Sequence, residues 1–305
     1  MNTDIAGRIV DVHAYLDESR IDVAGYVELA RRFGLSKIVL SPACTKRHEP
    51  DKSPRMYAVQ RTLLKSSVLR PLADIASRSF YDSEGRLRPW WRLFTRGGRE
   101  LNKVMHPDNA RLEEAIAAAP ELLRMWYWIN PAEKVPLTTL GEVLRNRQIV
   151  GIKFHAYWHC FDLKALNPYL AFCAEQDIPV YLIMGFGRSG NCEYVLRQHP
   201  RTKVIFGYGG FPYFSSVWKQ IKETPNKYID LTSFHLDRQL IGSALRIVGP
   251  DRCLYGSDSP YNFCDEQGGF DYPKTFQRNT FDFLDRGAYE AIYWKNFHAL
   301  AGGRL

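Results

Sequence analysis

Long apolar runs are missing from this sequence of 305 residues. No stretch approaches the roughly 20 consecutive apolar residues that a membrane-spanning helix needs. The first residues, Met1 to Asp4, also lack the basic start and apolar stretch of a secretory signal peptide. The hydrophobic share of 45% and the charged share of 24% are typical of a globular chain. We therefore expect a cytoplasmic protein with no membrane partner.

Sequence patterns that define several other protein classes are absent as well. The six cysteines show neither a CxxC pair nor regular spacing, so we interpret them as reduced, mostly packed thiols. No glycine-rich GxGxxG sequence follows a strand and opens a helix, which argues against a dinucleotide-binding fold. No segment repeats at a fixed period, which excludes the repeat architectures.

An excess of positive charge is present in only one segment. Residues 45–106 contain 14 Lys and Arg against 6 Asp and Glu, and the rest of the chain carries 27 of each sign. This segment is too long for an ordinary strand-to-helix loop, which runs to about 6 residues. We interpret it as a basic insertion within a single domain that spans residues 1–305. Two readings of the insertion stay open: a cationic lid over a site, and a solvated basic face.

Short apolar runs alternate with helical patterns along most of the chain. Eight of these runs predict strands, and nearly every one is followed by a helix: residues 9–13, 37–41, 123–129, 150–154, 180–184, 203–207, 228–231 and 253–255. This alternation indicates a parallel sheet buried on both faces. Eight units in this length favour an α/β fold of the (β/α)8 TIM-barrel type, with the basic insertion after the second strand.

Polar side chains stand where several of these strands end. The motifs are Asp11-Val12-His13-Ala14-Tyr15, Gly151-Ile152-Lys153-Phe154-His155, Ile183-Met184, Gly207-Tyr208-Gly209-Gly210 and Gly256-Ser257-Asp258-Ser259-Pro260. Because the first and eighth strands of a closed barrel are neighbours, His13 and Asp258 are expected to meet at its mouth. The alternation of side chains along a strand points Lys153 and His155 the same way.

These motifs and their order resemble the amidohydrolase-related family of metal-dependent (β/α)8 hydrolases and decarboxylases. The resemblance implies that His13 and Asp258 bind or orient groups at a metal. Where that family carries its second, third and fourth histidines, this chain has Tyr15, Met184 and Tyr208. Neutral tyrosine is a poor zinc ligand, and a thioether suits soft ions. We expect no cofactor and no tightly bound metal, the alternative being weak zinc at His13 and Asp258.

Two groups of residues are assigned to the predicted site. The catalytic group is His13, Lys153, Tyr208 and Asp258, in which the lysine holds an anion or acts as an amine base and the phenol donates a proton or a hydrogen bond. The substrate-binding group is Tyr15, His155, Met184, Arg86, Arg88 and Trp90. For each residue a structural role is the alternative, such as a His–Asp hydrogen bond or an apolar filler at Met184.

These residues lead to three functional hypotheses. The first is a hydrolase or lyase that cleaves an ester, lactone, amide or carbon–carbon bond of an anionic small molecule without a tightly bound metal. The second is a weakly metal-dependent hydrolase or decarboxylase. The third is a non-catalytic pseudoenzyme that binds an acidic partner such as a carrier protein. Nucleic acid is disfavoured, because no recognition motif accompanies the basic insertion. The oligomeric state is left open.

Overall fold

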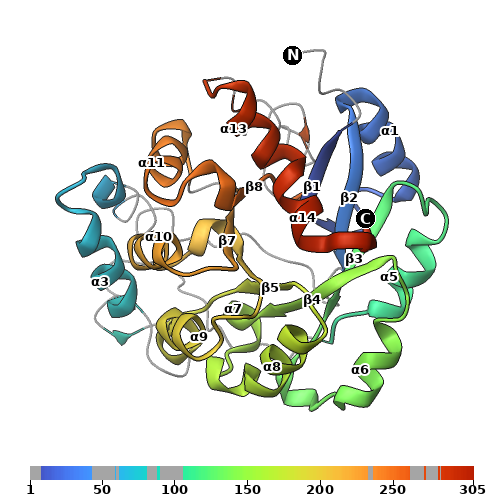
Figure 1. Cartoon of the computed structure of the whole chain (residues 1–305), viewed down its shortest axis with the longest axis horizontal. Helices are drawn as coiled ribbons and strands as arrows, with labels where there is room; N and C mark the ends of the chain where they lie inside the picture. The colour runs from blue at the N-terminus through green and yellow to red at the C-terminus, as the bar shows by residue number, and fades with distance from the viewer. Residues whose placement is uncertain are drawn as a thin grey trace.

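The described strands form one parallel sheet that follows chain order from the first strand to the eighth (Figure 1). The computed structural model describes residues 8–42, 59, 62–80, 88–89, 106–232, 236–261, 271–272, 281 and 283–305. The strands are β1 (Ile9–Leu16), β2 (Leu35–Pro42), β3 (Leu123–Trp128), β4 (Ile149–His155), β5 (Val180–Ile183), β6 (Val204–Phe206), β7 (Lys227–Asp230) and β8 (Cys253–Leu254). Each predicted strand overlaps one of these, and β1 extends past its predicted end to include Tyr15.

The sheet closes between its first and last strands. Ala14 forms a parallel bridge with Ser259, just beyond β8. The Tyr15 amide donates to the Ser259 carbonyl at 2.7 Å, and the Asp258 amide donates to the His13 carbonyl at 2.8 Å. We call this contact the β1–β8 seam. The predicted (β/α)8 barrel is therefore confirmed.

Helices surround the strands on the outside of the barrel (Figure 1). They are α1 (Val23–Phe33), α3 (Arg70–Phe80), α5 (Asn109–Ile116), α6 (Leu137–Val143), α7 (Ala156–His159), α8 (Asn167–Glu175), α9 (Cys192–Gln198), α10 (Phe214–Glu223), α11 (Arg238–Val248), α13 (Arg286–Glu290) and α14 (Asn296–Ala301). Asp22 caps the start of α1 by accepting from the Gly25 amide, and Gly34 ends it in the left-handed conformation. None of the described helices has the length and apolar character that crossing a membrane requires.

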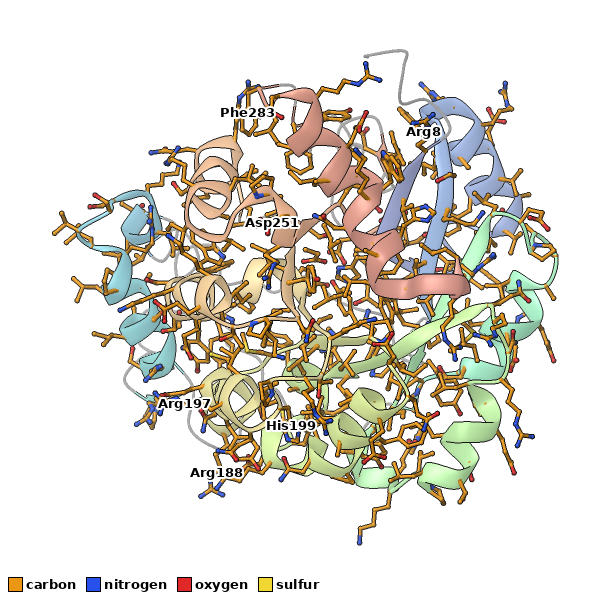
Figure 2. All side chains as sticks on the ribbon, viewed as in Figure 1. Arg8, Arg188, Arg197, His199, Asp251 and Phe283 are labelled. Atoms are coloured by element: carbon orange, nitrogen blue, oxygen red, sulfur yellow. The ribbon has the colours of Figure 1, made fainter. Side chains whose placement is uncertain are left out.

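Two apolar layers follow from the alternation of side chains along the strands. One fills the barrel interior, and the other packs the strands against the helices. Figure 2 draws the described side chains, which fill the space between the ribbons. The interior layer contains Val10, Val12, Val39, Trp126, Val150, Tyr181, Ile183, Ile205 and Leu254, joined by Phe297 and Leu300 from α14. The Arg304 guanidinium donates to the carbonyls of Leu144 and Ile149, at the start of β4. The C-terminal segment thus covers the amino ends of the strands, and a site is expected at the opposite end.

The described part of the basic insertion lies at the periphery of the barrel. Helix α3 packs against α10 (Figure 1), and the Asp74 carboxylate accepts from the amides of Ser215 and Ser216 in the first turn of α10. Arg88 is exposed, whereas Arg86 and Trp90 lie outside the described residues. The lid over the site therefore stays a prediction, as does the division into one domain with an insertion.

Replacing Asp74 by alanine should lower the free energy of unfolding by about 1–2 kcal/mol, since a helix cap of this kind contributes that much. The substitution also leaves the Ser216 hydroxyl without the oxygen that it contacts at 2.6 Å. Urea unfolding measures the effect. Asp74→Asn keeps an acceptor oxygen and should lose less; equal stability of the alanine variant and the wild type would contradict the capping role.

The described cysteines are thiols. No disulfide joins any two of the described cysteines, which are Cys160, Cys173, Cys192 and Cys253. Burial raises the pKa of the Cys160 thiol to about 11. Cys44 and Cys264 lie outside the described residues. Among the four described cysteines, the reduced state predicted from their spacing is therefore what the structure has.

Candidate active site

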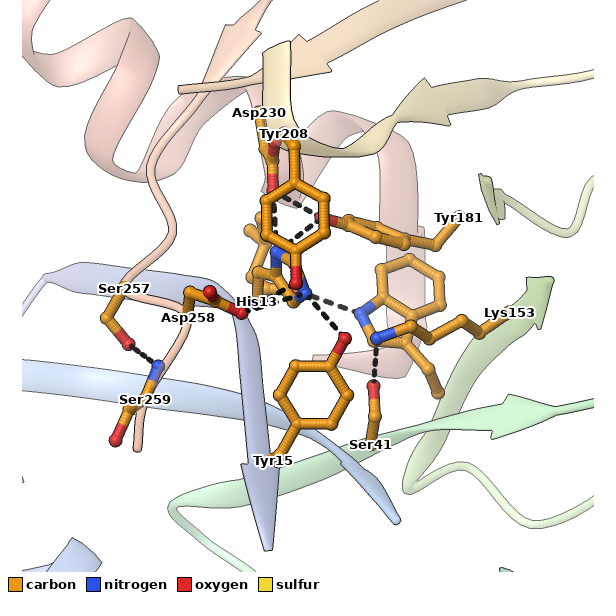
Figure 3. Close-up of polar contacts among 12 residues, drawn as sticks. His13, Tyr15, Ser41, Lys153, Tyr181, Tyr208, Asp230, Ser257, Asp258 and Ser259 are labelled. Atoms are coloured by element: carbon orange, nitrogen blue, oxygen red, sulfur yellow. Dashed lines mark hydrogen bonds and ion pairs between the residues drawn. The ribbon is translucent and has the colours of Figure 1, made fainter. Parts of the chain in front are cut away.

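A buried polar cluster lies at the carboxyl ends of the strands, centred on His13 of β1 (Figure 3). The His13 ring is fully buried. Its Nδ1 atom lies 2.9 Å from Oδ2 of Asp230, at the end of β7, and 2.6 Å from the Tyr181 hydroxyl of β5. The Tyr181 hydroxyl also donates to the same Asp230 oxygen. Asp230 therefore holds both the imidazole and the phenol in place.

The contacts of His13 assign its tautomer. Because the Asp230 carboxylate only accepts, Nδ1 carries the proton and Nε2 has the free lone pair. Nε2 lies 3.2 Å from the Tyr15 hydroxyl, which donates to it. Burial and then the Lys153 ammonium lower the pKa of His13 to about 4. At neutral pH His13 is thus an uncharged acceptor for the Tyr15 phenol.

Tyr208 and Asp258 form the second half of the cluster. The Tyr208 hydroxyl donates to Oδ1 of Asp258 at 2.9 Å, and that oxygen is 3.7 Å from His13 Nε2. Both residues have left-handed backbones, with φ of 53° for Tyr208 and 57° for Asp258. Non-glycine residues adopt this conformation at a cost, and such strain gathers at functional sites. The conformation directs these two side chains toward each other and toward His13.

The protonation states of this pair suit acid–base chemistry. Burial raises the pKa of Asp258 to about 7, against the lowering effects of the Tyr208 hydrogen bond and of Lys153. Burial and the neighbouring Asp258 raise the pKa of Tyr208 well above its usual value. Asp258 can therefore gain or lose a proton near neutral pH, whereas Tyr208 stays protonated and acts as a hydrogen-bond donor.

Lys153 of β4 brings a buried cation to the same place. Its ammonium donates to the Ser41 hydroxyl at 2.9 Å and lies 4.0 Å from the centre of the Tyr15 ring. The rings of Trp128 and Tyr181 are each 5.2 Å from it. Three aromatic faces around an ammonium stabilise its charge. The cluster thus combines one fixed cation with a titratable carboxyl group.

The structure brings together most of the residues predicted for the site. His13 lies beside Tyr15 and Asp258, and Tyr208 donates to Asp258. Lys153 joins this group over the Tyr15 ring. His155 lies at the end of the same strand as Lys153, stacked on Trp128 with ring centres 5.3 Å apart. Their catalytic and substrate-binding roles stay predictions.

Met184 follows the last residue of β5 and is buried. It belongs to the apolar layer between strands and helices, together with Leu182, whereas Tyr181 and Ile183 face the barrel interior. The alternation along β5 explains the difference, because a shift of one residue changes the face of the sheet. Ile183 is therefore the last interior residue within β5, and the substrate-binding role of Met184 stays a prediction.

Sequence reasoning missed Tyr181 and Asp230, which hold His13. Both lie inside short apolar strands, Val180–Ile183 and Lys227–Asp230. A carboxylate at the end of an apolar strand was a signal for Asp230, since a buried charge needs a partner. Tyr181 counted as one more apolar residue and gave no comparable signal.

The residues at the expected metal positions do not fit a tight metal site. Tyr15 and Tyr208 fill the space around His13 and Asp258 and donate hydrogen bonds to them. Among the residues that the structure describes, no three His, Cys, Asp or Glu side chains form a group that could hold a metal ion. A catalytic zinc normally has three protein ligands of these types. Weak or absent metal binding stays a prediction.

Together, the fold and the cluster define a (β/α)8 barrel with polar residues where barrel enzymes carry their active sites. A family model described as amidohydrolase matches residues 93–300, more than half of the chain. The chain belongs to the amidohydrolase family. The match includes Lys153, Tyr208 and Asp258 but begins after the strand that carries His13. A search of curated proteins finds no match to this chain.

Solved structures with the same fold include a hydrolase and two decarboxylases. A putative 2-pyrone-4,6-dicarboxylic acid hydrolase from Pseudomonas putida has a TM-score of 0.58 and 14% identity, covering 98% of this chain and 99% of that one. 2,6-Dihydroxybenzoate decarboxylase from Rhizobium has a TM-score of 0.56 and 14% identity, with 97% and 98% covered. Dihydroxybenzoic acid decarboxylase from Polaromonas sp. JS666, with bound manganese and the inhibitor 2-nitroresorcinol, has a TM-score of 0.53 and 16% identity. The match covers 97% of this chain and 96% of that one.

Proposed function

We propose that this protein is a hydrolase or lyase that cleaves an ester, lactone, amide or carbon–carbon bond in an anionic small molecule, without a tightly bound metal. The observation that carries the proposal is the Tyr208–Asp258 pair beside His13, in which burial raises the pKa of the carboxyl group to about 7. Family membership and the names of the similar structures, which include acidic substrates, support the same reaction class.

In the hydrolytic form of the proposal, Asp258 is the general base. Its carboxylate takes a proton from water as the water oxygen attacks the carbonyl carbon. The protonated Tyr208 phenol donates a hydrogen bond to the oxygen on which negative charge develops. Lys153 holds the anionic group of the substrate, and the neutral His13 fixes the Tyr15 phenol. Each role matches the protonation state that the surroundings of the residue favour.

Decarboxylation is the second candidate reaction, and it uses the Asp258 carboxyl group in its protonated form. There the protonated Asp258 gives its proton to the carbon from which carbon dioxide leaves. A group with a pKa of about 7 is half protonated at neutral pH, so both forms are present. The pH profile separates the two reactions: kcat/KM rises with pH through about 7 for hydrolysis and falls for decarboxylation.

The proposal is tested on purified protein with a panel of lactones, aryl esters, amides and aryl carboxylates, before and after treatment with a chelator. Turnover of at least one member that survives chelation is the expected result. If no member of the panel is turned over by a folded protein, or if chelation abolishes turnover and zinc or manganese restores it, the proposal fails.

Protein purified without added metal should contain well under one transition metal per chain, because phenols occupy two of the ligand positions. Imidazoles placed at three interior positions should change this. The triple variant Tyr15→His, Ile183→His and Tyr208→His, together with His13 and Asp258, offers enough ligands for one zinc ion per chain. Elemental analysis after dialysis measures both.

The matched control places the third imidazole at Met184 instead of Ile183. Since Met184 lies in the outer apolar layer, this variant should stay far below one zinc per chain. Equal zinc in the two triple variants would contradict the assignment of the interior face of β5. Near-stoichiometric zinc in the wild type would contradict the metal-free proposal itself.

A further inference from the structure

Two buried ring N–H groups in this cluster lack hydrogen-bond partners. Trp128 Nε1 and His155 Nε2 are both inaccessible to solvent, and neither has a hydrogen-bond partner among the described residues. A buried polar group left unsatisfied costs about 1–3 kcal/mol. The two rings stack with an interplanar angle of 18°, so both unsatisfied groups lie in one stack at the ends of β3 and β4. Such a pair calls for an explanation.

The neighbours of His155 make both groups donors. The Trp158 amide donates to His155 Nδ1 at 3.3 Å, so Nδ1 is the acceptor and the proton of the neutral ring is on Nε2. Burial and then the Lys153 ammonium lower the pKa of His155 well below its usual value, which keeps the ring neutral. The indole Nε1 of Trp128 is always a donor. The stack therefore presents two N–H groups and no acceptor.

A cation accompanies these two donors. Trp128 pairs with Lys153 in the register of β3 and β4, and the Lys153 ammonium lies 5.2 Å from the centre of the Trp128 ring. A group that only accepts hydrogen bonds and carries negative charge would satisfy both N–H groups and neutralise the ammonium. A carboxylate has two oxygens that share one negative charge, so it matches two N–H groups beside one ammonium.

We propose that Trp128 Nε1–H, His155 Nε2–H and the Lys153 ammonium form a carboxylate-binding subsite at the ends of β3 and β4. This deepens the proposed function, on which it rests for the location of the site, by naming the anionic group of the substrate. The carboxylate is held on the β3–β4 side, while the reacting bond faces Asp258 across the barrel. Trp128 becomes a substrate-binding residue through its N–H group.

The test uses benzoate as the probe and the 15N-labelled indole resonances of the full-length protein. Saturating benzoate should move the Trp128 N–H proton resonance downfield, since that proton enters a hydrogen bond to an anion. Neutral benzamide, which has the same shape, should leave it in place. Trp128→Phe identifies the resonance, and it should raise the dissociation constant of benzoate about tenfold, as should His155→Phe.

Trp126→Phe is the matched control. Trp126 lies in the same strand and already donates its indole N–H to the Val12 carbonyl at 2.9 Å. Its loss should leave the dissociation constant of benzoate unchanged. If that variant does not fold, the titration of the wild type still decides the matter.

Three outcomes would overturn the subsite: no saturable binding of benzoate, binding that leaves the Trp128 resonance unmoved, or a shift caused by inorganic phosphate and not by benzoate. Because benzoate binding needs no turnover, the two proposals fail separately. Binding without turnover of any substrate contradicts the proposed reaction alone, whereas turnover without a response of Trp128 contradicts the subsite alone.

Discussion

Asp258→Asn should lower kcat by about 10²- to 10⁴-fold on whichever substrate of the panel is turned over, because general acid–base catalysis contributes that much. Asparagine keeps an oxygen to accept the Tyr208 hydrogen bond and tolerates the left-handed backbone at this position, so the fold is retained. It cannot exchange a proton. The pH dependence of kcat/KM near 7 in the wild type should therefore disappear in the variant.

Asp177→Asn is the control for this change. Asp177 has a φ of 54°, so the same replacement is made in the same backbone conformation. Its side chain is exposed and pairs with Lys203. This variant should keep the activity and pH profile of the wild type. An Asp258→Asn enzyme with unchanged kcat, or one that keeps the pH dependence, would show that Asp258 is not the acid–base group.

Gly151→Ala should destabilise the barrel by about 3 kcal/mol or more. A Cβ atom at this position of β4 would lie 2.1 Å from the Pro179 carbonyl oxygen and 2.8 Å from the Trp126 ring. The Pro179 oxygen already accepts from the Ile152 amide at 3.1 Å, so it belongs to the β4–β5 ladder and cannot move aside cheaply. Overpacking against rigid neighbours is costly. Urea unfolding measures the loss.

Gly242→Ala provides the comparison within the same chain. This glycine lies in α11, and its added Cβ would have only the Arg246 guanidinium nearby, at 3.6 Å. A helical glycine replaced by alanine in open space should gain about 0.5–1 kcal/mol. Similar stability changes for the two variants would mean that the close approach of β4 and β5 at Gly151 does not limit the barrel.

The order of strands and the general place of the cluster could be predicted because both depend on local patterns. Apolar runs mark the strands, and the carboxyl ends of parallel strands meet at one end of a barrel. The alternation of side chains along β4 predicted that Lys153 and His155 point the same way, and in the structure both lie beside Trp128. Predicting these features needs only the alternation of side chains along a strand and the rule that the carboxyl ends of the strands meet at one end of the barrel.

The partners across the barrel could not be predicted in the same way. His13 and Asp230 are separated by 217 positions in the chain, and no local pattern relates them. The side of the barrel wall on which Met184 lies could not be predicted either, because a shift of one residue exchanges the two faces of a strand. The basic composition of residues 45–106 predicts the charge of the insertion but not where the insertion lies relative to the site. The lid therefore stays a prediction.

The β1–β8 seam has a consequence for the order of events during synthesis. Its contacts join the first strand to the last: the Ser257 amide donates to the Asp11 carboxylate across 246 positions of the chain. Contacts of such high sequence separation form late, because the loop they close is long. His13 and Asp258 lie on opposite sides of this seam. A nascent chain therefore carries seven strands with no complete site, and the reacting groups come together only when β8 docks onto β1.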